Sequence, residues 1–259
     1  MPRSGSIDNR WYDTLGDEWW APRGRMTLLR QLNPARAAYF RRVCARAFGR
    51  DARDGGDLRS LRVLDVGCGG GFLAEALARW GAQMSGVDAS AATIEVARRH
   101  ADAQGLRIDY QVADAAQLPF ADGAFDAVVS SDFLEHVSDR LDAVVSEQAR
   151  VLRAGGLLGF ETVNRTWRAR LVLIWLGQRI LRVAPPHLHD ARLFVRPRDL
   201  EDCLLRHGVR VDETHGLVPA RHPLLFLAGY LLRRESGGFR LGRDRSISYI
   251  GFGIKAPRD

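Results

Sequence analysis

The sequence predicts an α/β fold of the Rossmann-like type, in which helices cover both faces of a mostly parallel sheet. From residue 61 onward, short apolar segments alternate with segments of helical periodicity. The helices between them are long enough to connect parallel strands by right-handed crossovers. A glycine-rich turn also follows the first apolar segment, as in folds that bind a ligand at this edge. We expect a seven-stranded sheet with an antiparallel edge strand.

The alternation defines the elements in chain order. Buried strands are expected at 61–67, 83–88, 107–114, 125–132 and 157–164. Helices are expected between them at 72–80, 90–104 and about 139–152. Ser90 is a suitable N-cap for the second helix, and Gly105 is suited to end it. Two cleaner alternations, at 209–214 and 247–256, predict an antiparallel pair of terminal strands.

The 259 residues divide into two expected parts. Residues 1–55 are rich in Arg and Trp and are expected to form an N-terminal helical cap. Residues 56–259 are expected to form the main ligand-binding domain. A segment at about 165–200 interrupts the strand–helix alternation, so we expect a lid or a membrane-facing insertion there.

Composition excludes several classes of protein. Apolar residues make up 46% and charged residues 27% of the chain, as in globular proteins. No apolar run reaches the ~20 residues that span a bilayer, and the N-terminus lacks the apolar core of a secretory signal. The three cysteines are widely spaced and fit neither a disulfide framework nor a zinc site. We therefore expect a cytoplasmic protein in a reducing environment.

The formal charge is +7, and Lys255 is the only lysine, so arginine carries almost all of the positive charge. Arginine-favouring codons of a GC-rich genome account for this excess. The alternative is an anionic surface such as the inner face of a membrane. No nucleic-acid-binding motif accompanies the charge, so we expect no nucleic-acid partner.

The glycine-rich turn runs from Asp65 to Gly71 and has the spacing G-x-G-x-G. This spacing differs from the G-x-G-x-x-G of dinucleotide sites. Asp88 ends the second strand, where a carboxylate can accept both hydroxyls of a ribose. Asp114 ends the third, where it could face an adenine amino group. An acidic crevice for ribose, adenine and a positive centre suits S-adenosylmethionine, so the sequence predicts a class I methyltransferase fold. Glycines that serve only a tight turn are the alternative.

Several motifs match those of one family. They are Trp19-Trp20, Asn33-Pro34-Ala35-Arg36, residues 64–75, Glu135-His136-Val137, Asn164-Arg165, His189-Asp190 and Phe194-Val195-Arg196-Pro197. Over roughly residues 15–215 the chain resembles the ubiquinone-biosynthesis O-methyltransferases, which methylate polyprenyl phenols and catechols. It departs from them at Asp132, where the family usually has Glu, and over residues 216–245.

The resemblance implies methyl transfer from S-adenosylmethionine to a hydroxyl of a lipophilic (prenylated) phenol, catechol or quinol. It also implies that Arg36 reaches the cofactor carboxylate. The residues expected to bind the cofactor are Arg36, Asp65, Gly67, Gly69, Gly71, Asp88, Ala89, Asp114, Ala115 and Ser131.

A phenol has a pKa near ~10, so its proton must be removed for transfer at neutral pH. Asp132, Glu135 and His136 follow the fourth strand, at the edge where ligands bind. In one hypothesis they hold Mg²⁺ or Zn²⁺, which would orient a catechol and lower its pKa; the resemblance associates this set with metal dependence. In another, the catalytic pair is His136, as general base, and Glu135. A third reading gives the pair a role in packing only.

Residues 168–186 carry apolar side chains on one side of a helix and basic or polar ones on the other. The apolar set is Val172, Leu173, Leu176, Ile180 and Val183, and the polar set is Arg168, Gln178, Arg179 and Arg182. Such a helix could make a peripheral contact with an anionic membrane, or it could cover the pocket as a lid. A second apolar stretch, 222–234, also ends in arginines.

Other functions stay open at this point. A C- or N-methyltransferase acting on another small-molecule acceptor is the main alternative, and another prenylated or aromatic metabolite could replace the ubiquinone precursor. A base methylase is disfavoured because residues 130–133, SSDF, lack the Asn-Pro-Pro-Phe signature. A non-enzymatic protein is disfavoured because it has no need of Asp88.

Overall fold

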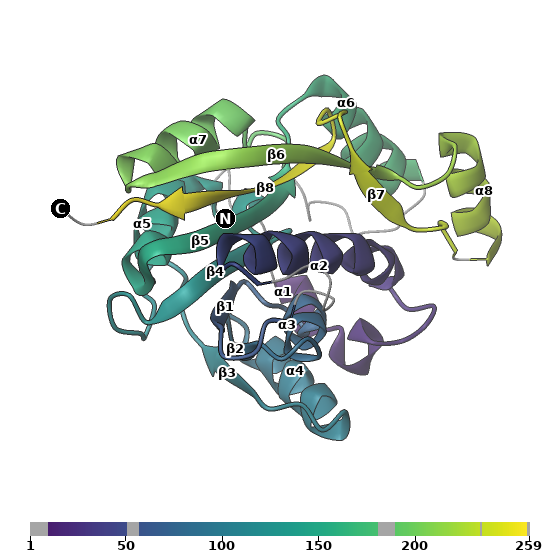
Figure 1. Cartoon of the computed structure of the whole chain (residues 1–259). Helices are drawn as coiled ribbons and strands as arrows, with labels where there is room; N and C mark the ends of the chain where they lie inside the picture. The colour runs from purple at the N-terminus through teal and green to yellow at the C-terminus, as the bar shows by residue number, and fades with distance from the viewer. Residues whose placement is uncertain (1–9, 51–56, 181–189, 234, 258–259) are drawn as a thin grey trace.

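The computed structural model describes residues 10–50, 57–180, 190–233 and 235–257. They form a single sheet in the order β3-β2-β1-β4-β5-β8-β6-β7, with helices on both faces (Figure 1). The five strands β1 to β5 are parallel, and β8 runs antiparallel between β5 and β6. This confirms the predicted fold class and the antiparallel pair at its edge.

The sheet has eight strands in the described residues, one more than the seven expected. They are β1 (Arg62–Val66), β2 (Gln83–Asp88), β3 (Ile108–Val112), β4 (Phe125–Ser131), β5 (Leu152–Val163), β6 (Val209–Pro219), β7 (Phe239–Gly242) and β8 (Ser248–Lys255). The additional strand β7 pairs with the last residues of β6, from Gly216 to Pro219. The four residues of β7 follow a pair of glycines. So short a run shows too little alternation of apolar and polar side chains to distinguish a strand from a loop in the sequence.

The helices agree with the predicted alternation. They are α1 (Arg10–Asp13), α2 (Thr27–Ala47), α3 (Phe72–Ala78), α4 (Ala91–Ala103), α5 (Leu141–Val151), α6 (Trp167–Ala169), α7 (Pro197–Arg206) and α8 (Pro223–Arg233). Shorter 3-10 turns are η1 (Gly16–Trp19), η3 (Leu134–His136) and η4 (Ser138–Arg140). Ser90 caps α4 as expected, because its hydroxyl accepts a hydrogen bond from the Thr93 amide at 3.0 Å.

Two hydrophobic cores lie on the two faces of the sheet. One contains Val63 and Val129 together with residues of α2, α3 and α4. The other contains Leu64 and Val128 together with residues of α5 and α7. Neighbouring residues of one strand point to opposite faces, so a strand buried on both faces is apolar throughout.

The strand order creates a crevice beside β1. The chain leads from β1 outward through β2 to β3, and then returns to β4 on the other side of β1. Helices that follow two neighbouring strands then lie on opposite faces, which leaves space at the carboxyl ends of β1 and β4. This edge carries the site described below.

The insertion differs from its prediction. An amphipathic α-helix was expected over 168–186, but α6 continues into a π-helix, η5 (Arg170–Ile180), and residues 181–186 lie outside the described residues. A π-helix has wider turns than an α-helix, so the side chains that share a face differ from those predicted. Leu173 and Ile174 pack against a small cluster around Val163 and Phe194.

Among the described helices, none combines the length with the apolar character that crossing a bilayer requires.

Helix α2 packs directly onto the sheet. Its residues Tyr39, Phe40 and Val43 are buried in the first core. A Cβ atom at Gly159 of β5 would lie 2.6 Å from the Phe40 ring, so the absence of a side chain at Gly159 admits this ring. The helix is therefore held by the same core as the sheet.

We expect Phe40→Ala to lower the free energy of unfolding by about 3–5 kcal/mol, because the ring fills a fully buried site. Urea denaturation measures this change. Leu205→Ala, at a position 63% exposed on α7, is the control and should change it by less than about 0.5 kcal/mol. Equal effects of the two substitutions would contradict the role of α2 in the core.

Candidate active site

A cavity of about 2910 Å³ opens at the carboxyl edge of the sheet. Its walls come from the ends of β1, β2, β4 and β5, from the N-terminal segment, and from residues within 163–177, 190–192, 217–230 and 239–248. A pocket for one drug-sized ligand usually measures roughly 300–1,000 Å³. The cavity therefore has room for a cofactor and a second molecule together.

The glycine-rich turn forms one wall. Gly67 and Gly69 line the cavity and have φ of 74° and 51°, a left-handed backbone that glycine adopts without strain. A Cβ atom at Gly69 would lie 2.8 Å from the Trp19 ring, so the turn also requires glycine for this contact. Gly71 has φ of 92° and is the N-cap residue of α3, outside the cavity lining.

Asp88 lies at the end of β2 and lines the cavity beside Ala89. Its carboxylate accepts hydrogen bonds from the Gly69 amide at 3.0 Å and the Ser90 amide at 2.9 Å. Burial raises its pKa. Each carboxylate oxygen has further lone pairs, so Asp88 can hold the glycine turn and still accept from a ligand.

Asp114 and Ala115 line the cavity after β3. One Asp114 oxygen accepts from the Ala116 amide at 3.0 Å, and the other pairs with Arg140 at 2.8 Å. The hydrogen bond from Arg140 lowers the pKa of Asp114. The carboxylate is thus ionised and half exposed at the mouth of this part of the cavity.

Arg36 of α2 lies buried at the cavity floor between two carboxylates. Its Nη2 atom is 2.9 Å from Asp132 and 3.2 Å from Glu161. Its Nε atom is buried with no hydrogen-bond partner among the described residues. Asp132 has φ of 51°, which is uncommon for a residue with a side chain and often marks functional sites.

Glu161 is a residue of this floor that the sequence analysis missed. Its Oε2 accepts from the Ser131 hydroxyl at 2.9 Å and the Asp132 amide at 3.0 Å. Its Oε1 atom and Asp65 Oδ2 are buried without partners in the described part of the chain. Burial raises the pKa of Glu161 and of Asp65 to about 7. The signal in the sequence that could have identified Glu161 was a single acidic residue inside the apolar strand predicted at 157–164.

The structure separates the predicted pair Glu135 and His136. They are neighbours in η3, a 3-10 turn, so their side chains point in different directions. Glu135 is fully buried behind the cavity and accepts a hydrogen bond from Thr162 at 2.7 Å. Burial, then Asp132 and Glu161, raise the pKa of Glu135 well above its usual range. His136 is half-buried and lines the cavity.

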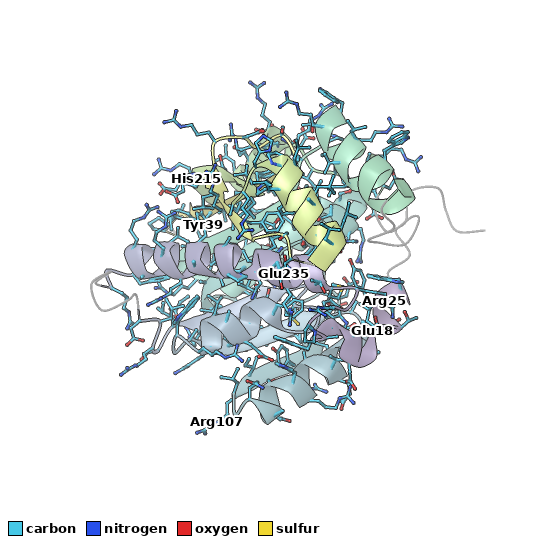
Figure 2. The ribbon with its side chains drawn as sticks, turned by 90° about the vertical axis from the view of Figure 1, so that its right-hand side faces the viewer. Glu18, Arg25, Tyr39, Arg107, His215 and Glu235 are labelled. Atoms are coloured by element: carbon cyan, nitrogen blue, oxygen red, sulfur yellow. The ribbon has the colours of Figure 1, made fainter. Side chains whose placement is uncertain are left out.

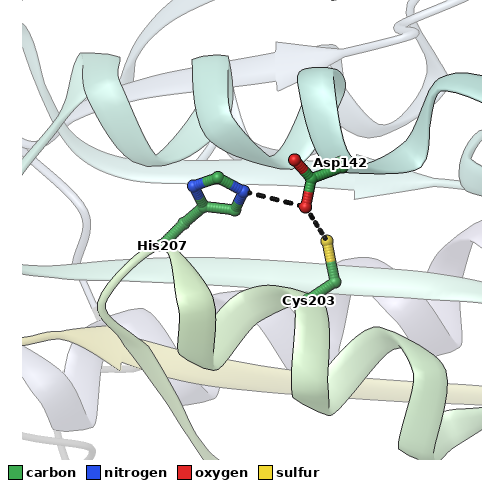
Figure 3. A group of neighbouring side chains, drawn as sticks. All are labelled: Asp142, Cys203 and His207. Atoms are coloured by element: carbon green, nitrogen blue, oxygen red, sulfur yellow. Dashed lines mark hydrogen bonds and ion pairs between the residues drawn. The ribbon is translucent and has the colours of Figure 1, made fainter.

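The predicted metal-ligand set therefore does not converge in this arrangement. In the described part of the chain, one group of three metal-ligating side chains brings its ligand atoms within 4.8 Å of one another, namely Asp142, Cys203 and His207 (Figure 3). Asp132, Glu135 and His136 form no such group, because Asp132 is paired with Arg36 and Glu135 faces Thr162.

Aromatic side chains of the N-terminal segment cover the end of the cavity beside the glycine-rich turn. Tyr12 stacks on Trp19, with ring centroids 5.8 Å apart, and meets the His136 ring edge-on at 5.9 Å. Trp20 stacks on His100 of α4 at 3.5 Å and donates a hydrogen bond to the Gly70 carbonyl at 2.9 Å. In the same segment, Arg25 pairs with Glu18 at 2.7 Å (Figure 2).

The outer part of the cavity lies between the insertion and α8. Apolar side chains from both segments line it, together with residues of β6 and β7; they include Val172, Leu173, Ile174, Leu217, Phe226, Leu227, Tyr230 and Phe239. His189, which the sequence singled out beside Asp190, lies outside the described residues, while Asp190 lines the cavity.

The family model described as "Methyltransferase domain" matches residues 64–160. Two relatives, both named ubiquinone biosynthesis O-methyltransferase, match over most of the chain. The protein of Sinorhizobium medicae is 38% identical over 92% of this chain and 91% of its own length. That of Chelativorans sp. is 40% identical over 80% of this chain and 81% of its own length.

Solved structures show the same fold. The magnesium protoporphyrin IX methyltransferase of Synechocystis, solved with bound SAH, has a TM-score of 0.54 and 20% identity over 79% of this chain and 78% of its own. A SAM-dependent methyltransferase of Methanosarcina mazei has a TM-score of 0.57 and 19% identity over 80% of this chain and 99% of its own.

The relatives are similar over nearly the full chain, from the Trp-rich N-terminal segment to the strands that follow the insertion. The family model covers the glycine turn and the chain from β1 into β5, and the solved methyltransferases share the fold. The chain is therefore an S-adenosylmethionine-dependent methyltransferase and belongs to the family of the ubiquinone biosynthesis O-methyltransferases.

Proposed function

We propose that the enzyme methylates a hydroxyl of a lipophilic, prenylated phenol, catechol or quinol of the ubiquinone-precursor type. The observation that carries this proposal is the difference in polarity between the two ends of this cavity. One end holds the glycine turn, the buried carboxylates and His136, and the other is lined by Leu173, Phe226 and neighbouring apolar side chains. A molecule with a phenolic head and a hydrocarbon tail matches both ends.

The residues of the cofactor end fit S-adenosylmethionine. The buried oxygens Asp65 Oδ2 and Glu161 Oε1, which have no partner in the described chain, suit the positive charges of its methionine end. Arg36 Nε is a buried donor available to its carboxylate, and Asp88 is available to the ribose. When bound, the cofactor supplies an electrophilic methyl group on its sulfonium.

Other predicted contacts keep their roles within this proposal. Asp114 and Ala115 face the adenine, and Ala89 and Ser131 border the cofactor through their backbone. The N-terminal segment acts as a cap, because Trp19 and Trp20 pack on the glycine turn. Cofactor exchange then requires the cap to move away from Gly70.

We expect Asp88→Ala to weaken cofactor binding by roughly 1.5–3 kcal/mol, because the ribose hydroxyls lose a charged acceptor. Titration calorimetry with S-adenosylmethionine measures this loss. Asp109→Ala, at an exposed position on β3, is the matched control and should bind normally. Unchanged affinity in a folded Asp88→Ala protein would remove Asp88 from the ribose site.

We assign proton removal to His136. Its ring lines the cavity near the cofactor end, and a neutral imidazole can accept a phenolic proton near pH 7. Glu135 is a positioning residue rather than a base, because it is fully buried outside the cavity lining and its contact with Thr162 anchors η3 to β5. Asp132, partly exposed beside Arg36, borders the acceptor.

A divalent cation held by Asp132, Glu135 and His136 is the alternative to a histidine base. It requires Glu135 to leave Thr162 and Asp132 to leave Arg36. Chelation distinguishes the two. EDTA leaves turnover unchanged if His136 acts alone, whereas loss of turnover that Mg²⁺ restores would replace the base with a cation site.

The function is tested with isotopically labelled S-adenosylmethionine, a prenylated catechol and a bacterial lipid extract, followed by mass spectrometry of the labelled product. We expect the label on oxygen. We also expect His136→Gln to lower kcat by about 10²–10⁴-fold while cofactor affinity is retained. Label on carbon or nitrogen would instead indicate a C- or N-methyltransferase. Full activity of the His136→Gln enzyme would show that His136 is not the base.

We also propose that the insertion and α8 dock on an anionic membrane, from which a lipophilic acceptor can enter the cavity. Large apolar side chains of both segments are exposed, namely Trp167, Leu171, Trp175, Leu224, Leu225, Leu231 and Leu232. These seven exposed apolar side chains belong to two segments that line one cavity, which is typical of an interaction surface. Arg168 and Arg170 lie in the insertion and Arg221 just before α8, and all three are exposed and would face anionic headgroups. The segments also line the cavity, so they serve as a lid as well.

We expect the enzyme to co-sediment with vesicles, more strongly as anionic lipid increases and less strongly as salt increases. The combined change of Trp167, Leu171 and Trp175 to Ser should release it into the supernatant. Leu205→Ser changes an equally exposed leucine on α7 and is the control. If the wild-type enzyme stays in the supernatant at low salt, the membrane role is contradicted and these segments act only as a lid.

A further inference from the structure

A second group of reactive side chains lies away from the cavity, between α5 and α7 (Figure 3). Asp142 lies in the first turn of α5, while Cys203 is in α7 and His207 is its C-cap residue. Because Cys203 and His207 are four residues apart, they lie on the same side of the helix. None of the three lines the cavity, so methyl transfer does not explain them.

The three ligand atoms are spaced for one metal ion. Asp142 Oδ1 lies 3.7 Å from Cys203 Sγ and 3.2 Å from His207 Nε2, and all three atoms lie within 4.8 Å of one another. Tetrahedral Zn²⁺, with its usual bond lengths of about 2.0–2.3 Å, separates its ligands by roughly 3.3–3.6 Å. The side chains would therefore need little movement to share an ion.

We propose that Asp142, Cys203 and His207 form a zinc site that joins α5 to α7. Binding releases the Cys203 thiol proton, so the thiolate and the carboxylate neutralise the two charges of the ion, and His207 binds in its neutral form. Water occupies the fourth position. The mixed sulfur, nitrogen and oxygen set suits Zn²⁺ rather than Mg²⁺ or Ca²⁺.

Arg206 competes with the metal for Asp142. Its Nη2 atom lies 2.8 Å from the same Oδ1 atom, so in the metal-free protein the guanidinium neutralises this carboxylate. Arg206 is more than half exposed and can turn into solvent when an ion arrives. The same geometry thus explains the metal-free contacts and predicts which residue opposes binding.

The thiol environment is consistent with a site that is protected until a metal binds. Cys203 is almost fully buried and donates its S–H to Asp142. All three cysteines of the chain are free thiols, and the other two lie outside this group.

Cobalt replaces zinc as a spectroscopic probe. Metal-free full-length enzyme, prepared with chelator and then dialysed, is titrated with Co²⁺. We expect a sulfur-to-cobalt charge-transfer band in the near ultraviolet and the visible bands of tetrahedral Co²⁺, both removed by Zn²⁺. Cys203→Ser should abolish the charge-transfer band, and His207→Gln should weaken affinity at least about tenfold.

Arg206→Ala separates a metal site from a simple polar contact. We expect it to tighten Co²⁺ binding several-fold, because the competing cation is gone while all three ligands remain. His215→Gln removes a histidine of β6 outside the group and should bind Co²⁺ like the wild type. Absence of the charge-transfer band from the wild type and from Arg206→Ala, both folded by circular dichroism, would overturn the proposal.

Discussion

The buried guanidinium of Arg36 holds the active site together. It lies between Asp132 and Glu161, at the carboxyl ends of β4 and β5, while its backbone belongs to α2. A buried charge that loses its partners is strongly destabilising, so this arrangement fixes the N-terminal helix to the catalytic edge of the sheet. It also supports the left-handed backbone of Asp132, whose amide donates to Glu161.

The same contacts determine the electrostatics of the cavity floor. Two acids of the floor, Asp65 and Glu161, and Glu135 behind it are buried, and Arg36 compensates only part of their charge. Burial raises the pKa of all three, so the floor without ligand carries less negative charge than its composition indicates. A cationic ligand would favour ionisation of these groups, which couples cofactor charge to the protonation of the floor.

Much of this could be read from the sequence, because apolar alternation and glycine turns are local signals. Asp88 and the strands β1 to β5 were predicted in this way. Glu161 was missed because its importance depends on Arg36, 125 positions earlier in the chain. Glu135 and His136 are adjacent in the sequence, but a 3-10 turn directs their side chains apart, which adjacency alone does not indicate.

Tertiary contacts also explain the remaining differences. Packing of α5 on α7 brings Cys203 next to an aspartate 61 residues away, a contact that cysteine spacing does not reveal. The wider turns of the π-helix η5 place different side chains on each face of the insertion than the predicted α-helix would. The strand β7 appeared because pairing with β6 stabilises a segment that has little strand character of its own.

The short strand β7 has a consequence for the behaviour of the free enzyme in solution. A long, uncovered outer strand presents unpaired amides and carbonyls on which another chain can assemble, which promotes aggregation. Here β7 covers the end of β6 with only four residues, and Arg240 lies at its centre. A strand this short, with a charged residue inside it, offers a poor template for edge-to-edge assembly at this end of the sheet.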